Sequence, residues 1–184
     1  MKYTLLPPLE VLKKYLDYNP DTGILTWKKV SNRRIKIGQE AGSAPPPNSP
    51  SRGGRCYRQF SFKGRNYYNH RVAYYMYHGV DPSEKHKQVD HINGNKLDNR
   101  IKNLRLATNQ ENQWNISSLQ RNNTSGKTGV TWYARCKKWV AQIEVRDNQK
   151  RKGYNLGYYT KKEDAIQARI EAEKKYFGDF RHGL

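Results

Sequence analysis

The stretch Gln88–Asn115 reads QVDHINGNKLDNRIKNLRLATNQENQWN and decides the fold of the region around it. Apolar residues flank Asp90 and His91 near its start. Leu104 and Leu106 alternate with polar residues further along, which is the period of a half-buried strand. Asn, Gly and Asp crowd the residues in between, where a loop is expected. The pattern therefore predicts a strand, a long loop and a second strand.

A helix is expected directly after the second strand. Thr108 is followed three residues later by Glu111, which is the spacing of a capping box. In that arrangement each side chain accepts a hydrogen bond from a backbone amide that the helix start leaves unpaired. Asn112 then falls in the first turn or so of the helix.

Two oxygen-bearing side chains in this stretch, those of Asp90 and Asn112, are candidate ligands for a divalent cation. Mg²⁺ commonly takes one or two protein oxygens, while water and phosphate oxygens complete its coordination. The side chain of His91 leaves the opposite face of a regular strand, but a bulge or the strand end can bring it to bear on a neighbouring water. Because the ordinary pKa of histidine is about 6.5, a neutral His91 can act there as a general base.

The wording DHxxGNxxxNRxxNLRxxTxxEN resembles the ββα-metal core of the His-Asn-His (HNH) endonucleases, particularly the phage homing type. The resemblance implies that Asp90 binds the metal, His91 activates water and Asn112 is the second protein ligand. Asn103 would be the middle asparagine, which braces the loop and does not hold the metal. Asn112 stands where some branches have a final histidine, which disfavours zinc and favours one Mg²⁺ or Mn²⁺ ion.

The loop between the two strands also has a simpler interpretation. Asn, Gly and Asp tolerate left-handed geometry and bond their own backbone, so five residues of the loop alone would indicate a surface turn: Asn93, Gly94, Asn95, Asp98 and Asn99. Basic residues lie on or just after the loop. They are either a solvated charged face or phosphate contacts that position a duplex without reading its sequence: Lys96, Arg100, Lys102 and Arg105.

The composition points to a polyanionic partner. The 184 residues include 35 Lys and Arg against 16 Asp and Glu, a formal net charge of +19, and the pI is near 10. Residues 1–126 and residues 127–184 are each net positive, so both are expected to touch phosphate, with double-stranded DNA as the first candidate. No apolar run approaches about 18 residues, which disfavours a membrane. The mean hydropathy of −1.10 predicts thin cores.

The number and spacing of the cysteines limit the kinds of site and the cellular compartment that fit this chain. Cys56 and Cys136 lie far apart without CxxC spacing, which excludes a Cys-rich zinc module and a disulfide framework. A reduced cytoplasm, in a bacterial or phage-infected cell, fits this usage. The apolar patch at the N-terminus is interrupted at Pro7, so no signal peptide is expected. The sequence gives no dimer signal and implies no protein partner, which favours a monomer.

The residues before this stretch are expected to support it. Their patterns predict, in order, a short helix, a turn, a strand, a hairpin and a second helix over residues 8–16, 19–23, 24–27, 56–69 and 70–78. The first helix would carry Leu16 on its apolar stripe. His70, at the start of the second helix, is interpreted as a structural histidine.

The C-terminal region has its own organisation. Polar residues 116–126 predict a linker. Three strands are then expected, followed by a helix that the spacing of Thr160 and Glu163 opens with a second capping box: residues 129–133, 139–146, 154–159 and 160–177. A stripe of alanines at Ala165, Ala168 and Ala172 would let this helix lie closely on the sheet.

The wording TGVTWYARCKKWVAQIEV…LGYYTKKEDAIQARIEAEKKYFGDF, within residues 125–180, resembles the DNA-binding domain of plant ethylene-responsive (APETALA-type) factors. In that family the open face of the sheet enters the major groove, where base edges are distinguishable. If alternate residues of the middle strand face the helix, the DNA side carries Val140, Gln142, Glu144 and Arg146. Flanking contacts would come from Arg135, Lys137, Arg151 and Lys152. Thr131 and Asn155 depart from the plant wording, so the plant target sequence is not carried over.

Together the patterns predict an α+β protein: a ββα-metal nuclease core with an N-terminal helix and hairpin, then a small three-stranded antiparallel sheet packed on one helix. The nuclease domain would span 1–115, with its core at 56–115, and the DNA-binding domain 127–184. The expected function is a metal-dependent, homing-type DNA endonuclease that nicks, with water activated by His91. The alternatives are a non-catalytic, sequence-specific DNA-binding regulator with a nuclease-like core and, favoured by charge alone, an RNA-binding protein.

Overall fold

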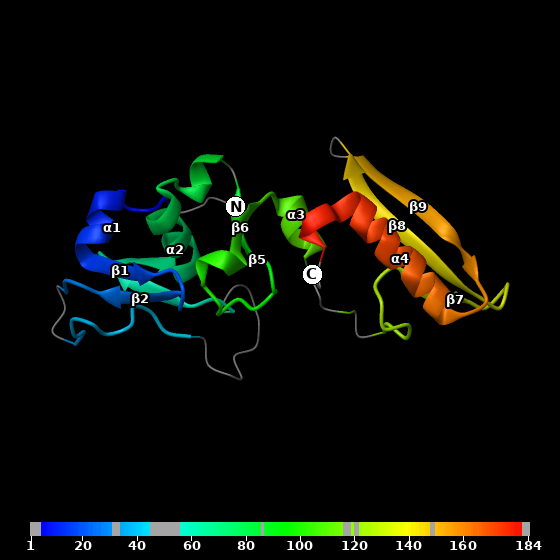
Figure 1. Ribbon diagram of the computed structural model, residues 1–184, viewed down its shortest axis with the longest axis horizontal. Coiled ribbons are helices and arrows are strands. Elements are labelled where there is room, and N and C mark those ends of the chain that lie inside the picture. The colour runs from blue at the N-terminus through cyan, green and yellow to red at the C-terminus, as the bar shows by residue number, and fades with distance from the viewer. Residues whose placement is uncertain are drawn as a thin grey trace. The chain divides into compact units, whose positions relative to one another are not determined.

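The chain forms two compact units of mixed helix and strand, Met1–Asn112 and Gln113–Leu184 (Figure 1). The sheets are small and antiparallel, so the predicted α+β class is confirmed. No helix among the described residues is both long and apolar enough to cross a membrane. The computed structural model describes residues 5–30, 34–44, 56–85, 87–115, 119, 122–147 and 150–181.

The first unit opens with helix α1 (Leu9–Tyr15) and a hairpin of strands β1 (Leu16–Asn19) and β2 (Ile24–Trp27). The expectation that Leu16 belongs to the helix is wrong. Leu16 has an extended backbone, begins β1 opposite Trp27 and remains buried. A leucine can reach the core from either conformation, so its apolar character alone does not mark where the helix ends.

A second hairpin, β3 (Gln59–Phe62) and β4 (Arg65–Tyr68), leads into helix α2 (Asn69–His78), close to where the sequence predicts them. Their apolar faces meet α1 and the first hairpin in one core. Aromatic rings fill much of it, and the Trp27 ring stands edge-on to Phe60 with centroids 5.7 Å apart. The buried members are Leu12, Leu16, Leu25, Trp27, Ala41, Phe60, Phe62, Tyr67 and Val72.

Strands β5 (Gln88–His91) and β6 (Leu104–Ala107) pair antiparallel, and helix α3 (Asn109–Trp114) follows. This is the predicted order of the ββα core. The predicted capping box is formed, because the Thr108 amide donates to Oε2 of Glu111 at 2.6 Å and the Glu111 amide donates to Oγ1 of Thr108 at 3.2 Å. The strands rest on α2 through a small apolar cluster: Ala73, Val89 and Leu104.

The second unit is a three-stranded sheet with one helix along it (Figure 1). Strands β7 (Val130–Tyr133), β8 (Lys138–Asp147) and β9 (Lys150–Tyr159) are antiparallel in that order, and α4 (Lys162–Phe177) packs against them. The predicted sheet packed on one helix is therefore confirmed. Its buried apolar residues lie in two clusters: Val130, Ala141 and Ala165, and Ile143, Ala172 and Phe177.

The second predicted capping box is wrong. Helix α4 begins at Lys162, its N-cap residue is Lys161, and this end has no side-chain cap in the described part of the chain. Strand β9 continues to Tyr159, so Thr160 still belongs to the turn that leaves the strand. The spacing of Thr160 and Glu163 is right for a box, but the helix starts too late to use it.

The predicted linker contains an ordered turn. Residues 116–118, 120 and 121 lie outside the described residues, whereas 122–126 are described. Ser125 is buried, and its hydroxyl donates to the carbonyl oxygen of Lys127 at 2.8 Å. The Gly126 amide donates to Oδ1 of Asn123 at 2.7 Å. These bonds tie the turn to the start of the sheet, so this part of the expected linker is structured.

Arg169 of α4 forms a buried ion pair with Glu173 of the same helix and also bonds the sheet at an irregularity. The register of β8 and β9 shifts at Gln142, and the Gln142 carbonyl oxygen accepts a hydrogen bond from Nη1 of Arg169 at 2.5 Å. Nε of Arg169 donates to Oε1 of Glu173 at 2.9 Å, and Lys127 Nζ lies 2.7 Å from Oε2 of the same carboxylate. Gly129, at φ 80°, fits this packing because a methyl group there would lie 2.6 Å from Arg169 Nη1.

Replacing Arg169 with Met should lower the free energy of unfolding of this unit by about 3 kcal/mol, because a partly buried carbonyl and a buried carboxylate each lose a partner. Glu173 keeps Lys127, which limits the loss. Urea denaturation of the full chain measures it, with tryptophan fluorescence as the signal.

Gln167→Met is the matched control. Gln167 also reaches one helical turn ahead, donating to Glu171 at 3.1 Å, but this pair is exposed. Its replacement should change the free energy of unfolding by no more than about 0.5 kcal/mol. Equal losses in the two variants would contradict the buried-network interpretation.

Candidate active site

Asp90 sits on β5 with only 5% of its surface exposed. Its partner lies directly opposite on β6: Nε and Nη2 of Arg105 are each 3.0 Å from Asp90 Oδ2. Arg105 was predicted to contact DNA, but here its guanidinium is the counter-ion of the candidate metal ligand. A divalent cation at Asp90 would therefore share or take over this carboxylate.

Asn112 is held beside the same strand by a residue that the sequence analysis did not single out. Nδ2 of Asn112 donates to Oε1 of Gln88 at 2.6 Å. Gln88 and Asp90 are two residues apart on β5, so their side chains leave the same face. Because the amide nitrogen of Asn112 is bound to Gln88, Oδ1 is the atom of this side chain that would accept a cation. The period-two alternation that runs through Asp90 would have been the signal for Gln88, but the sequence analysis did not use it.

His91 is the last residue of β5, and its ring is buried. The pairing of the strand is regular, so no bulge brings His91 to the Asp90 face. Of the two arrangements considered, His91 therefore has the one at the strand end. Nε2 of His91 lies 3.1 Å from Oδ1 of Asn99. Because an amide oxygen only accepts, this contact requires the proton on Nε2 and leaves Nδ1 as the basic nitrogen of the neutral ring.

The environment of His91 favours the neutral ring. Burial lowers its pKa below the ordinary 6.5, and this outweighs the hydrogen bond to Asn99 and the nearby Asp90 carboxylate, which both raise it. A neutral imidazole at physiological pH is the form that can accept a proton.

Aromatic rings form one wall around His91. The His70 ring stands edge-on to it with centroids 5.1 Å apart, and Tyr57 lies 4.7 Å from His70 and 5.9 Å from His91. Burial lowers the pKa of His70 well below 6.5, so His70 adds no charge beside His91. Tyr57 was missed, since nothing in its local sequence distinguishes it from the other tyrosines.

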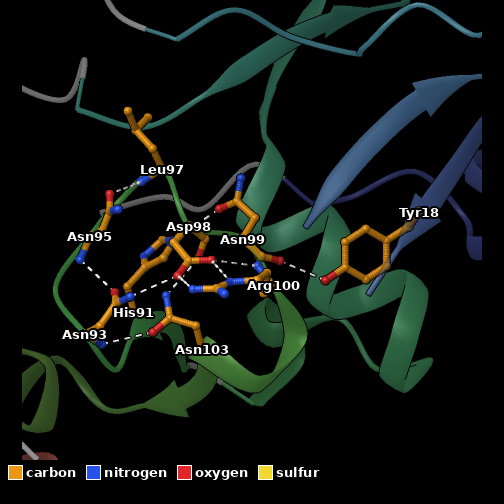
Figure 2. A network of polar contacts seen from close by, with 9 residues as sticks. All are labelled: Tyr18, His91, Asn93, Asn95, Leu97, Asp98, Asn99, Arg100 and Asn103. Atoms are coloured by element: carbon orange, nitrogen blue, oxygen red, sulfur yellow. Dashed lines mark hydrogen bonds and ion pairs between the residues drawn. The ribbon is translucent and has the colours of Figure 1, made fainter. Parts of the chain in front are cut away.

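The loop after β5 is a network of side-chain hydrogen bonds (Figure 2). Oδ1 of Asn103 accepts from the Asn93 amide at 3.0 Å, and its Nδ2 donates to the Asp98 carbonyl oxygen at 2.8 Å. One amide thus joins both sides of the loop. The simpler turn interpretation describes the tip well, where Asn95 and Leu97 amides donate to the asparagine side chains two residues earlier.

The four basic residues around the loop divide into two kinds. Lys96 and Lys102 are exposed, and Lys96 Nζ lies 5.2 Å from the centre of the Tyr57 ring. Arg100 donates from Nε and Nη2 to Asp98 at 2.7 and 2.5 Å, and Arg105 is paired with Asp90. Only the two lysines therefore present their charge mainly to solvent.

In the second unit, Gln142 and Glu144 are exposed on the sheet face away from α4, as the alternation predicts, while Val140 is half-buried. Arg135 and Lys137 are exposed in the turn between β7 and β8. Two exposed rings on the open face were not predicted as site residues: Tyr133 and Tyr158, with centroids 6.3 Å apart.

Three further predicted contacts on β8 and β9 differ in their positions. Arg151 lies on the open side, with Nε 3.5 Å from Glu144. Lys152 does not face that side, because it is opposite Val145, which packs toward α4. The backbone of Arg146 lies in β8, but its side chain is outside the described residues.

The oxygen donors at β5 and α3 fit a hard cation better than zinc. Among the described residues no group of three or more His, Cys, Asp or Glu side chains gathers as a metal site. Asp90 and Asn112 supply a carboxylate and an amide oxygen, a set suited to Mg²⁺ or Mn²⁺ with water and phosphate as the other ligands.

A comparison with protein families finds a match that covers the ββα region. Residues 67–114 match a family model described as HNH endonuclease. Protein 3.8 of Escherichia phage T7 is 37% identical over 68 residues, which is 37% of this chain and 55% of that protein. The chain therefore spans little more than half the length of this relative. No solved structure matches the chain.

The carboxyl of Asp98 should titrate far below its usual range. The Arg100 guanidinium, a backbone amide and Asn93 lower its pKa from 3.8 to about 2 against an opposing effect of burial. Because the pKa is lower in the folded state, this stabilisation is complete above about pH 4 and is lost as the pH falls through 2. Arg100→Met should move the pKa back toward 3.8, measured by carbon NMR of the carboxyl.

Lys102→Met, which removes an exposed charge from the same loop, should leave the Asp98 titration close to that of the wild type. An Asp98 pKa that is the same in the wild type and in Arg100→Met would show that the ion pair does not control it.

Proposed function

We propose that the chain is a metal-dependent DNA endonuclease of the homing-type HNH class that nicks one strand of duplex DNA. Residues 1–115 would carry the nuclease and residues 127–184 the DNA-binding module. The observation that carries the proposal is the arrangement at the end of β5. There Asp90 lies beside the Gln88–Asn112 pair on one face, and His91 is oriented by Asn99 on the other.

The protein's own residues would perform the proton transfer. Asn99 holds the His91 proton on Nε2, so Nδ1 can accept a proton from the attacking water. The neighbouring His70 ring, neutral and buried, gives this imidazole a fixed packing surface. Asp90 and Asn112 would hold one Mg²⁺ or Mn²⁺ ion. When bound, that ion would stabilise the negative charge of the phosphate and the leaving oxygen.

Duplex DNA is the substrate that the charge distribution favours. Lys96 and Lys102, exposed beside the loop, would contact phosphates near the bond to be cut. In the second unit, the open sheet face would enter the major groove, with Gln142 and Glu144 reaching base edges and Arg135 and Lys137 flanking them. With one nuclease core and one ion, a monomer would cut one strand per encounter.

A DNA-binding regulator without catalysis is the second candidate. The Arg105–Asp90 ion pair favours it, because a guanidinium already neutralises the carboxylate that a cation needs. In that case the protein would bind duplex DNA tightly and with strong salt dependence, and it would not cut the DNA with any metal.

His91→Ala should reduce the rate of nicking of supercoiled plasmid at least about 100-fold, because the general base is lost, while DNA affinity stays within about twofold. Gel electrophoresis follows nicked and linear products in Mg²⁺, Mn²⁺ or EDTA, and EDTA should abolish cutting. His78→Ala, an exposed histidine at the end of α2, is the control. Wild-type cutting by His91→Ala would refute the base assignment, and binding without cutting by the wild type would favour the regulator.

Gln88→Met should weaken Mn²⁺ binding about tenfold, because the Asn112 amide would no longer be fixed with Oδ1 outward. Isothermal titration calorimetry on the free protein gives this affinity without any cleavage. Gln113→Met, an exposed substitution next to Asn112 on α3, should leave it unchanged. If both variants bind Mn²⁺ like the wild type, Asn112 is not oriented by Gln88 for a metal.

A further inference from the structure

We infer that the β1–β2 hairpin is a positioning element for the general base: it fixes the backbone of Asn99, and through Asn99 it fixes the ring of His91. This inference rests on the proposed nuclease function. The hairpin lies far away in the sequence from the loop that it contacts. Three separate contacts, all made to residues 99–101, carry it.

The first contact is a hydrogen bond from β1. The hydroxyl of Tyr18 donates to the backbone carbonyl oxygen of Asn99 at 2.8 Å (Figure 2). Burial raises the pKa of Tyr18 far above neutrality, so the phenol keeps the proton it donates. Asn99 is itself only 3% exposed, and its side chain makes the bond to His91. One residue therefore links Tyr18 and His91.

The second contact comes from the turn of the hairpin. The carbonyl oxygen of Pro20 accepts a hydrogen bond from the Ile101 amide at 3.0 Å. Hydrogen bonds hold the shape of the turn, because Oδ1 of Asn19 accepts from the amides of Asp21 and Thr22 at 3.0 and 3.1 Å. Tyr18 and Pro20 thus hold the backbone on both sides of Arg100.

The third contact is steric. Gly23 has φ 75°, and a methyl group on it would lie 2.5 Å from the carbonyl carbon of Asn99 and closer still to the amide nitrogen of Arg100. The turn therefore rests directly on the peptide group between these two residues. Any side chain at position 23 would displace either the hairpin or the loop.

These contacts affect the proposed proton transfer only through Asn99, because none of them is made to His91 itself. A shift of the Asn99 backbone moves Oδ1, and the proton on Nε2 of His91 then loses its acceptor. The tautomer with the basic nitrogen on Nδ1 is no longer favoured, and the ring loses its orientation. Small displacements of a reacting group can reduce rates about 100-fold, so a remote hairpin can control kcat without touching substrate.

Tyr18→Phe tests the hydrogen bond alone. It should lower kcat for plasmid nicking about tenfold and leave KM within about twofold, since the tyrosine positions the base and does not bind DNA. Nitrogen NMR of the His91 ring in the metal-free protein should show a loss of the Nε2-protonated form. The control is Tyr15→Phe, the same chemical change at a ring that packs edge-on against Phe62 with centroids 5.1 Å apart.

Gly23→Ala tests the steric contact, with Gly64→Ala as a matched control. Both glycines have φ 75°, so both variants carry the same backbone strain, but a methyl group on Gly64 has no atom within 4 Å. Gly23→Ala should speed hydrogen exchange of the Ile101 amide, which donates to Pro20, by at least about tenfold relative to Gly64→Ala. Its kcat should fall while its KM is retained.

The nuclease function and the positioning role of the hairpin can fail separately. If the wild type cuts no DNA with any metal, the nuclease function fails, while Ile101 exchange and the His91 ring signals still decide whether the hairpin positions the histidine. If the wild type cuts, and Tyr18→Phe and Gly23→Ala both keep wild-type kcat, Ile101 exchange and His91 tautomer, the positioning role is overturned. Should Gly23→Ala fail to fold, Tyr18→Phe alone decides by the same readouts.

Discussion

The structure around His91 depends on how a polar loop satisfies its backbone hydrogen bonds. Between β5 and β6 the chain has no strand partner, so its donors and acceptors must be paired by other groups. Asparagine side chains supply them: Asn103 bonds both sides of the loop, and Asn93 and Asn95 each accept from an amide two residues ahead. Hydrogen bonds of asparagine side chains thus hold the loop closed, and they fix the positions of the site residues at its two ends.

The local patterns of the sequence were sufficient for most elements and for the order of the ββα core. Thr108 and Glu111 formed the predicted capping box, whereas Thr160 and Glu163, at the same spacing, did not, because the length of β9 decides where α4 can start. The contacts of Asn99 could not be predicted from the sequence. Its composition indicates a turn, and the bonds to His91 and Tyr18 are tertiary contacts across 8 and 81 residues.

Formal charge overstates how much of this protein is free to meet phosphate. Arg100 and Arg105 were counted with the lysines as basic residues near the loop, yet both guanidinium groups are engaged by carboxylates of the same core. The planar fork of arginine suits such pairing, while a lysine ammonium is more easily left in solvent. In this region the paired and the solvent-facing positive charges therefore divide by residue type, a division that a net charge does not reveal.

The Arg105–Asp90 ion pair allows the core to fold without a bound cation. A buried carboxylate without a counter-ion would strongly destabilise the strand pair, but the guanidinium opposite it supplies that counter-ion from within the chain. The core can thus keep its shape with no cation bound. On the proposed assignment, a chain whose Asn112 no longer binds the ion would therefore remain folded, so loss of the metal ligand and loss of the fold are separable in this core.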